Sequence, residues 1–152
     1  MPFFILLVLL SRPVVLPGPA YALLLTGFAV RVWAAGYIGL AARETSFTTP
    51  CRITNGPYKY LKHPLYLGNF LLVAGVLVLF NSPEIYALII MVLFIVMYGI
   101  IILSEDDYVK QLPVKKVEFQ INNCNGEIST MVILIVIVLI SLLVPKSILF
   151  TF

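Results

Sequence analysis

Long apolar runs with few charges constrain the possible fold of this chain more than any other feature of its sequence. Four such runs lie at residues 20–42, 64–80, 84–103 and 128–144. A helix needs about 20 apolar residues to cross the hydrocarbon core of a bilayer, and it satisfies its own backbone hydrogen bonds there. The pattern therefore predicts an all-α, multi-pass transmembrane helical bundle of about four to five helices.

The composition supports the same fold class and leaves little room for another domain. Hydrophobic residues make up 61% of the chain and charged residues 11%, whereas soluble domains carry about 25% charged residues. We expect a single integral membrane domain over residues 1–152, so that any active site lies at helix ends and short loops. The net charge of +3 is small and comes mainly from two loops, so no nucleic-acid binding is expected.

Residues 1–19 are expected to form a broken N-terminal segment rather than a complete span. The apolar stretch Phe3–Leu10 is too short to cross a membrane, and three prolines between residues 13 and 19 interrupt helix propagation. No basic residue precedes Arg12, so the sequence does not predict a cleaved signal peptide.

The distribution of basic residues predicts the orientation in the membrane. Basic residues are concentrated in two polar stretches, residues 43–62 and 104–127. The turn at residues 81–84 carries none, and it is so short that residues 64–80 and 84–103 must form an antiparallel helical hairpin. The positive-inside rule then predicts that both polar stretches face the cytosol.

The stretch NGPYKYLKHPLYLGN, residues 55–69, places polar and aromatic side chains at the start of an apolar helix. Burying such groups in lipid without partners is costly, so their presence needs a reason. Pro64 suits the first helical position and His63 the N-cap, so the N–H groups of Leu65 and Tyr66 are expected to lack intrahelical acceptors. Such a helix end favours a bound carboxylate or phosphate.

A polar strip and an acidic pair are expected to meet at this helix end. His63, Tyr66 and Asn69 recur every three residues, so they share one face of the helix. The antiparallel hairpin returns Glu105 and Asp106 to the same depth as His63. One pocket would then combine aromatic rings, an imidazole, a helix N-terminus and carboxylates, which suits a small ligand carrying both charges; no metal site is predicted.

Each of these features also has a simpler interpretation. Tyrosines and lysines such as those in residues 58–62 are common anchors at membrane interfaces. His63 could serve only as a helix cap, and residues 105–107 could be a solvated helix end. Arg31, the only charge in its apolar run, indicates either a functional residue in the bundle interior or a structural ion pair.

Four short motifs, taken in order along the chain, resemble those of a known family. They are Arg31 with Trp33 and Ala34, ITNGPY at residues 53–58, KHPLYLG at residues 62–68, and the acidic pair Glu105 and Asp106. In order and spacing the chain is similar to the isoprenylcysteine carboxyl methyltransferase family and its phospholipid methyltransferase relatives. The resemblance covers about residues 27–107.

The resemblance implies a membrane enzyme that uses S-adenosylmethionine (SAM), with a helical hairpin that carries the cofactor site at the cytosolic face. The methyl acceptor would be lipophilic and would enter from the bilayer, for example a prenylcysteine carboxylate or the head group of a membrane lipid. His63 and Glu105 are the expected catalytic residues, and Arg31 is expected to bind substrate. The residues expected to bind the cofactor are Cys51, Arg52, Ile53, Tyr58, His63, Pro64, Leu65, Tyr66, Asn69, Glu105 and Asp106.

Departures from the family pattern leave two other functions open. Lys62 stands where the family has arginine, Asp106 stands where it has glutamate, and residues 108–125 lack its aromatic tail. One alternative is an NADPH-dependent sterol-type membrane reductase, which has a similar H-P-x-Y-x-G block. NADPH carries several phosphates, however, for which Arg52, Lys59 and Lys62 offer few basic side chains. The other alternative is a non-catalytic membrane protein that retains the fold.

Overall fold

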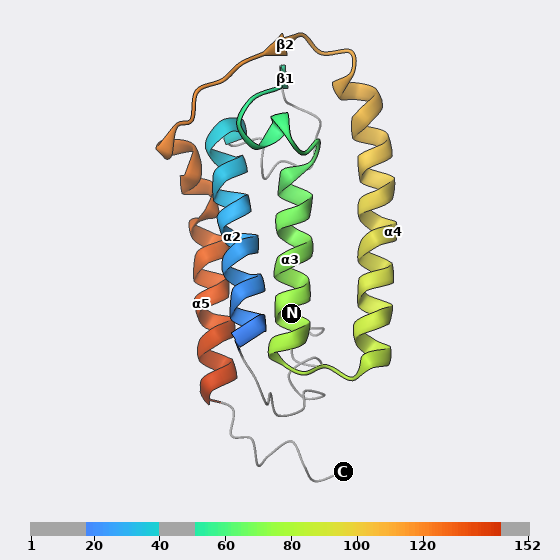
Figure 1. Cartoon of the computed structure of the whole chain (residues 1–152), viewed down its shortest axis with the longest axis vertical. Helices are drawn as coiled ribbons and strands as arrows, with labels where there is room; N and C mark the ends of the chain where they lie inside the picture. Colours follow the sequence, from blue (N-terminus) through green and yellow to red (C-terminus); the bar gives the residue numbers. More distant parts are fainter. Residues whose placement is uncertain (1–17, 40–50, 144–152) are drawn as a thin grey trace.

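Four helices standing side by side make up most of the fold. The structure, a computed structural model, describes residues 18–39 and 51–143. The helices α2 (Gly18–Ile38), α3 (Pro64–Leu79), α4 (Glu84–Val109) and α5 (Ile128–Leu143) lie in the order α5, α2, α3, α4 across the bundle (Figure 1). The predicted all-α, multi-pass bundle is thus confirmed. Nearly all of the predicted broken segment, residues 1–19, lies outside the described residues.

The helix boundaries follow local backbone chemistry. The described part of α2 starts at Gly18, with Pro19 in its first turn, where a missing N–H costs nothing. It ends at Ile38 rather than at the predicted residue 42, and Gly39 follows it with a φ of 69°. α4 continues past the predicted end at residue 103 to Val109, so the acidic residues 105–107 lie within the helix instead of beyond it.

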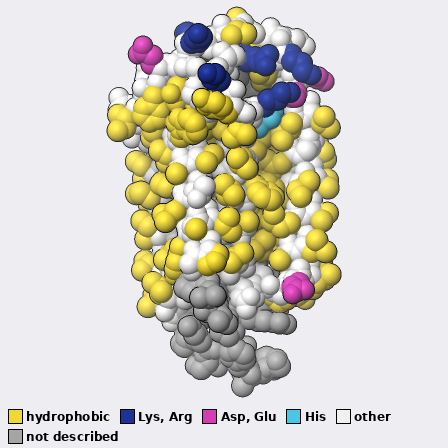
Figure 2. Space-filling view, in the orientation of Figure 1, with side chains coloured by type: hydrophobic (Ala, Val, Ile, Leu, Met, Phe, Trp, Pro, Cys, Tyr) yellow, Lys and Arg dark blue, Asp and Glu magenta, His cyan; other side chains and the backbone are white. Residues whose placement is uncertain are grey.

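The helices of the described part of the chain have the length and hydropathy of membrane spans. α2, α4 and the continuous segment formed by η3 (Ile121–Glu127) and α5 are each long and apolar enough to cross a bilayer. α3 is apolar but has 16 residues, just below the range of about 17 to 25 that spanning helices use. Figure 2 shows hydrophobic side chains along the bundle and lysine and arginine side chains gathered at one end, as expected for an integral membrane protein.

Glycines bring α2 and α3 into close contact. A Cβ atom added to Gly27 would lie 2.9 Å from the backbone oxygen of Gly68. Small residues of this kind let helix backbones approach in a membrane, where apolar side chains gain little by leaving lipid. Ala35 and Gly39 have the spacing of another such pair, but Gly39 lies beyond the helix end and faces Asn123.

A connecting segment, residues 110–127, crosses the polar end of the bundle from α4 to α5 (Figure 1). Its strand β2 (Val114–Lys115) pairs in parallel with β1 (Arg52–Ile53). The side chain of Asn55 adds two hydrogen bonds: its Nδ2 donates to the Val117 oxygen at 2.6 Å, and its Oδ1 accepts from the Val117 N–H at 3.0 Å. These bonds fasten the loop before α3 to the connecting segment.

We expect Gly27→Ala to destabilise the bundle, because the added methyl group would press against the backbone of α3. Overpacking of this kind costs about 1 to 3 kcal/mol. The measurement is the midpoint of thermal unfolding of the purified protein in detergent. Gly99→Ala on α4 is the matched control, since a Cβ atom there has no described atom within 4 Å. Equal midpoints for the two variants would contradict this account of the α2–α3 contact.

Candidate functional site

His63 ends the polar loop and begins α3. It occupies the N-cap with Pro64 directly after it, as predicted, and its side chain makes no capping hydrogen bond. The imidazole is therefore available to α4 across the hairpin. The N–H of Tyr66 donates to the His63 backbone oxygen at 3.2 Å, so the prediction that this N–H lacks an acceptor was wrong. The first turn tightens to an i to i+3 bond, which supplies the acceptor.

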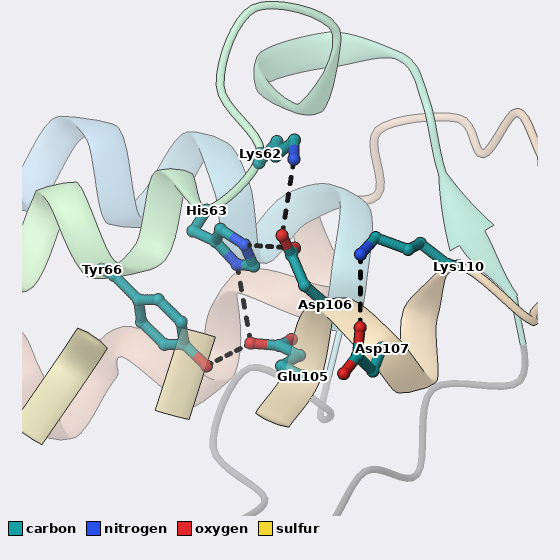
Figure 3. A network of polar contacts seen from close by, with 7 residues as sticks. All are labelled: Lys62, His63, Tyr66, Glu105, Asp106, Asp107 and Lys110. Carbon is teal, nitrogen blue, oxygen red and sulfur yellow. Dashed lines mark hydrogen bonds and ion pairs between the residues drawn. The ribbon is translucent and has the colours of Figure 1, made fainter. Parts of the chain in front are cut away.

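Side chains at the start of α3 meet the acidic residues of α4 at this end of the hairpin (Figure 3). His63 Nε2 lies 3.0 Å from Asp106 Oδ1, and His63 Nδ1 lies 3.5 Å from Glu105 Oε2. Tyr66 donates its hydroxyl to the same Glu105 oxygen at 2.5 Å. Lys62 Nζ lies 3.4 Å from the other Asp106 oxygen. The structure thus brings together the residues that the antiparallel hairpin was expected to place at one depth.

The two carboxylates favour the charged form of His63. Its hydrogen bond with Glu105 is the largest influence and raises the pKa of His63 above the usual 6.5, burial partly opposes this, and Asp106 adds to the rise. A protonated imidazole can donate one N–H to each carboxylate. Because the folded-state pKa is raised, the stabilisation is fully present below about pH 6.5 and is lost as the pH rises through the raised pKa.

A cavity of about 240 Å³ lies beside this cluster, between the loop at residues 51–62, the start of α3 and the ends of α2 and α4. Of the residues predicted to bind the cofactor, those that line it are Cys51, Arg52, Ile53, Tyr58, His63, Glu105 and Asp106. The other lining residues are Ile38, Thr54, Lys62, Val109 and Lys110. Sequence reasoning missed Ile38, Val109 and Lys110 because only the packing of α2 and α4 around the loop brings them here.

Tyr58 carries an unpaired hydroxyl at the cavity wall. The short helix η2 (Gly56–Lys59) holds Tyr58 at this position. Its hydroxyl is buried and has no hydrogen-bond partner among the residues that the structure describes. Burial raises the pKa of Tyr58, and the negative charge of Glu105 raises it further, so the hydroxyl keeps its proton. An unsatisfied hydroxyl of this kind costs about 1 to 3 kcal/mol, which a ligand that accepts its hydrogen bond would recover.

Four residues predicted to bind the cofactor lie outside the cavity lining. Pro64 and Leu65 are buried in the first turn of α3. Tyr66 does not line the cavity but donates a hydrogen bond to Glu105, which does. Asn69 lies deeper along α3. The predicted contacts of these four residues with a cofactor stay predictions.

Arg31 forms a buried ion pair inside the bundle. Its Nε and Nη2 donate to the two carboxylate oxygens of Glu127 at 2.8 and 2.7 Å, and its Nη1 donates to Asn69 Oδ1. This is the structural ion pair that was one of the two interpretations of Arg31; the predicted role in substrate binding stays a prediction. Sequence reasoning missed Glu127. The signal was present, because an arginine within a span needs a partner and Glu127 is the last acidic residue before the final apolar run.

Comparison with protein families gives one match. The model of a family described as phospholipid methyltransferase matches residues 18–112, which is more than half of the 152 residues. The match extends from the start of α2 to just beyond the end of α4, and it includes every residue that lines the cavity. Comparisons with curated proteins and with solved structures found no match.

We expect Glu127→Ala to destabilise the protein strongly, because Arg31 would be left as an uncompensated charge in the bundle. Breaking a buried ion pair in this way costs about 3 to 5 kcal/mol. The midpoint of thermal unfolding in detergent is the measurement. Glu118→Ala removes an exposed carboxylate from the same connecting segment and should leave the midpoint unchanged. A Glu127→Ala midpoint as high as that of Glu118→Ala would argue against the ion pair.

The charge state of His63 can be measured directly, because it is the only histidine in the chain. NMR titration of histidine-labelled protein in detergent should give a midpoint above 6.5, as the carboxylates require. Glu105→Gln should lower the midpoint because it removes the largest cause of the raised pKa. The control is Asp107→Asn, because the Asp107 side chain is 82% exposed and pairs with Lys110. This variant should leave the midpoint of His63 unchanged. A midpoint at or below 6.5 in the unmodified protein would be incompatible with the cluster as described.

Proposed function

The chain belongs to the phospholipid methyltransferase family of membrane methyltransferases, and from this premise we propose that its methyl donor is SAM and its acceptor is a lipophilic molecule of the bilayer. The acceptor would present a prenylcysteine carboxylate or a lipid head group. The observation that carries the proposal is the cavity at the polar end of the bundle, where His63, Glu105, Asp106 and Tyr58 converge.

The charges around the cavity suit a zwitterionic ligand. SAM carries an ammonium and a carboxylate, and the wall offers groups of both signs. Glu105 and Asp106 would pair with the ammonium. Arg52 and Lys110 line the same cavity and would pair with the carboxylate.

The aromatic wall supports the same assignment. The ring of Tyr58 lines the cavity and offers a π-face that attracts the positive sulfonium of SAM. The unpaired Tyr58 hydroxyl is a donor for which the described residues supply no acceptor, and SAM brings several oxygen and nitrogen acceptors. The cavity volume of about 240 Å³ lies below the about 300 to 1,000 Å³ typical of ligand sites, so we expect the cavity to widen on binding.

Methyl transfer from SAM requires mainly that the protein position the acceptor against the methyl group. When bound, SAM supplies a methyl group on a positively charged sulfur, which leaves as a neutral thioether when a nucleophile forms the new bond to the methyl carbon. The residues must align the nucleophile and keep water out. The carboxylate partners of His63 raise its pKa and so favour its charged form. An amine acceptor would need a base, for which His63 and Glu105 are the candidates, whereas a carboxylate acceptor needs none.

The orientation of the site forms part of the proposal. Six basic residues of the described chain lie in the loop and connecting segment at the cavity end: Arg52, Lys59, Lys62, Lys110, Lys115 and Lys116. The turn at the opposite end of the hairpin, residues 80–83, carries no basic residue, and α4 begins after it with Glu84. This asymmetry supports a cytosolic position for the cavity by the positive-inside rule.

We expect purified protein to transfer label from methyl-labelled SAM when it is supplied with a total lipid extract and a prenylated peptide. The label should enter a lipid or the peptide. The double variant His63→Ala, Glu105→Ala should lose SAM affinity by about tenfold or more, because each lost charge-assisted hydrogen bond contributes about 1.5 to 3 kcal/mol. Glu118→Gln, which removes an exposed carboxylate outside the cavity lining, is the matched control and should bind and transfer as the unmodified protein does.

Equal SAM affinity in the double variant and the control would rule out the proposed site. Binding of NADPH in place of SAM would favour the membrane reductase instead. SAM binding without transfer to any acceptor would support a protein that has kept the cofactor site and lost the reaction.

A further inference from the structure

The position of α4 needs an explanation, because this helix carries both acidic residues of the cavity. None of its 26 residues is buried by the described part of the chain. Its covalent link to α3 is the turn at residues 80–83, at the end opposite Glu105 (Figure 1). In a bilayer the exposed apolar side chains of α4 contact lipid as readily as protein, so hydrophobic burial does not hold the cavity end of the helix in place.

A hydrogen bond within the span joins α4 to α3. Asn69 Nδ2 donates to the hydroxyl of Tyr98 at 2.8 Å. The Tyr98 ring also packs edge-on against Tyr66, with ring centroids 5.0 Å apart, and stacks on Phe94 at 4.1 Å. Tyr98 and Glu105 are seven residues apart, which is two helical turns, so they share one face of α4. A contact that holds Tyr98 therefore also sets the direction in which Glu105 points.

Asn69 is itself held in one orientation. Arg31 donates to its Oδ1. A guanidinium has only donors, so the amide must turn its oxygen to Arg31, which leaves its NH₂ group for Tyr98. Arg31 is fixed in turn by its two hydrogen bonds to Glu127. One chain of polar contacts thus crosses the bundle from Glu127, the residue directly before α5, through α2 and α3, to Tyr98 on α4.

We propose that Tyr98 is a positioning residue: its bond to Asn69, which Arg31 and Glu127 orient, sets the rotation and distance of α4 so that Glu105 and Asp106 face His63. Tyr98 does not line the cavity, so it acts through the placement of α4. The part that this placement of α4 plays in SAM binding rests on the proposed function. The role of Tyr98 in placing α4 does not depend on it.

The competing explanation is that the cavity contacts alone hold α4. The bonds of His63 to Asp106 and of Tyr66 to Glu105 also join the two helices. They lie at the polar end, where His63, Glu105 and Asp106 are partly exposed and where a ligand would compete for the same carboxylates. The Asn69–Tyr98 bond is deeper in the span and is not used by a ligand in the cavity. Removing the Tyr98 hydroxyl separates the two explanations.

The test measures the position of α4 without reference to activity. Bioorthogonal spin labels at Leu67 on α3 and Leu103 on α4, both exposed, report the distance between the helices near the cavity. A second pair at Val78 and Ile85, also exposed, reports it near the turn. In Tyr98→Phe we expect the distance distribution of the first pair to broaden and that of the second pair to stay as narrow as in the unmodified protein.

Two further variants sharpen the comparison. Asn69→Asp should keep the first distribution narrow, because a carboxylate still accepts from Arg31 and can accept from the Tyr98 hydroxyl. Tyr86→Phe removes an exposed hydroxyl from the opposite end of α4 and should change neither pair. With the labels absent, SAM affinity should fall about fivefold in Tyr98→Phe, the effect of one neutral hydrogen bond, and should not change in Tyr86→Phe.

An unchanged Leu67–Leu103 distribution in Tyr98→Phe would overturn the proposal. Equal broadening of both pairs would overturn it as well, since that result means general loosening rather than loss of a positioning contact. If the unmodified protein does not bind SAM, the proposed function fails, and the distances alone decide whether Tyr98 positions α4.

Discussion

The buried ion pair between Arg31 and Glu127 is the interaction on which the arrangement of this bundle depends. A charge inside a membrane span is tolerated only with a partner, and here the guanidinium of Arg31 on α2 forms a bidentate pair with the carboxylate of Glu127, directly before α5. The remaining Arg31 donor orients Asn69 on α3. Three helices are therefore joined by polar bonds in a medium where apolar contacts between helices contribute little.

The cavity lies at the polar end of the same bundle. There the charged side chains have hydrogen-bond partners and are also accessible to a ligand. The N-terminus of α3 presents His63, and α4 runs beyond its apolar stretch to carry Glu105 and Asp106 next to it. The loop at residues 51–62 supplies much of the remaining wall, and its strand β1 is held by pairing with β2 of the connecting segment. The two carboxylates favour the charged form of His63, so the imidazole and the carboxylates form one network of charged hydrogen bonds at this site.

Much of the site was predictable because its parts are local or follow from one short turn. Pro64 at the first helical position and His63 at the N-cap are features of a few adjacent residues. The antiparallel hairpin then placed His63 and Glu105 at the same depth. Two predictions were wrong for local reasons as well. The first turn of α3 is tight enough to give the Tyr66 N–H an acceptor. The helix α4 continues beyond the predicted end to Val109, because Pro113, the next helix-breaking residue, lies further along the chain.

The sequence by itself determined that the chain crosses a membrane and roughly where, because the length of an apolar run and the thickness of a bilayer are compared one segment at a time. It also determined the end of the bundle at which polar chemistry gathers. Only the tertiary structure decided that Arg31 pairs with Glu127, 96 residues away, that Asn69 turns its amide toward Tyr98, and that the connecting segment closes over the loop before α3. Those contacts depend on which helices are neighbours, and in lipid the apolar faces alone do not specify that order.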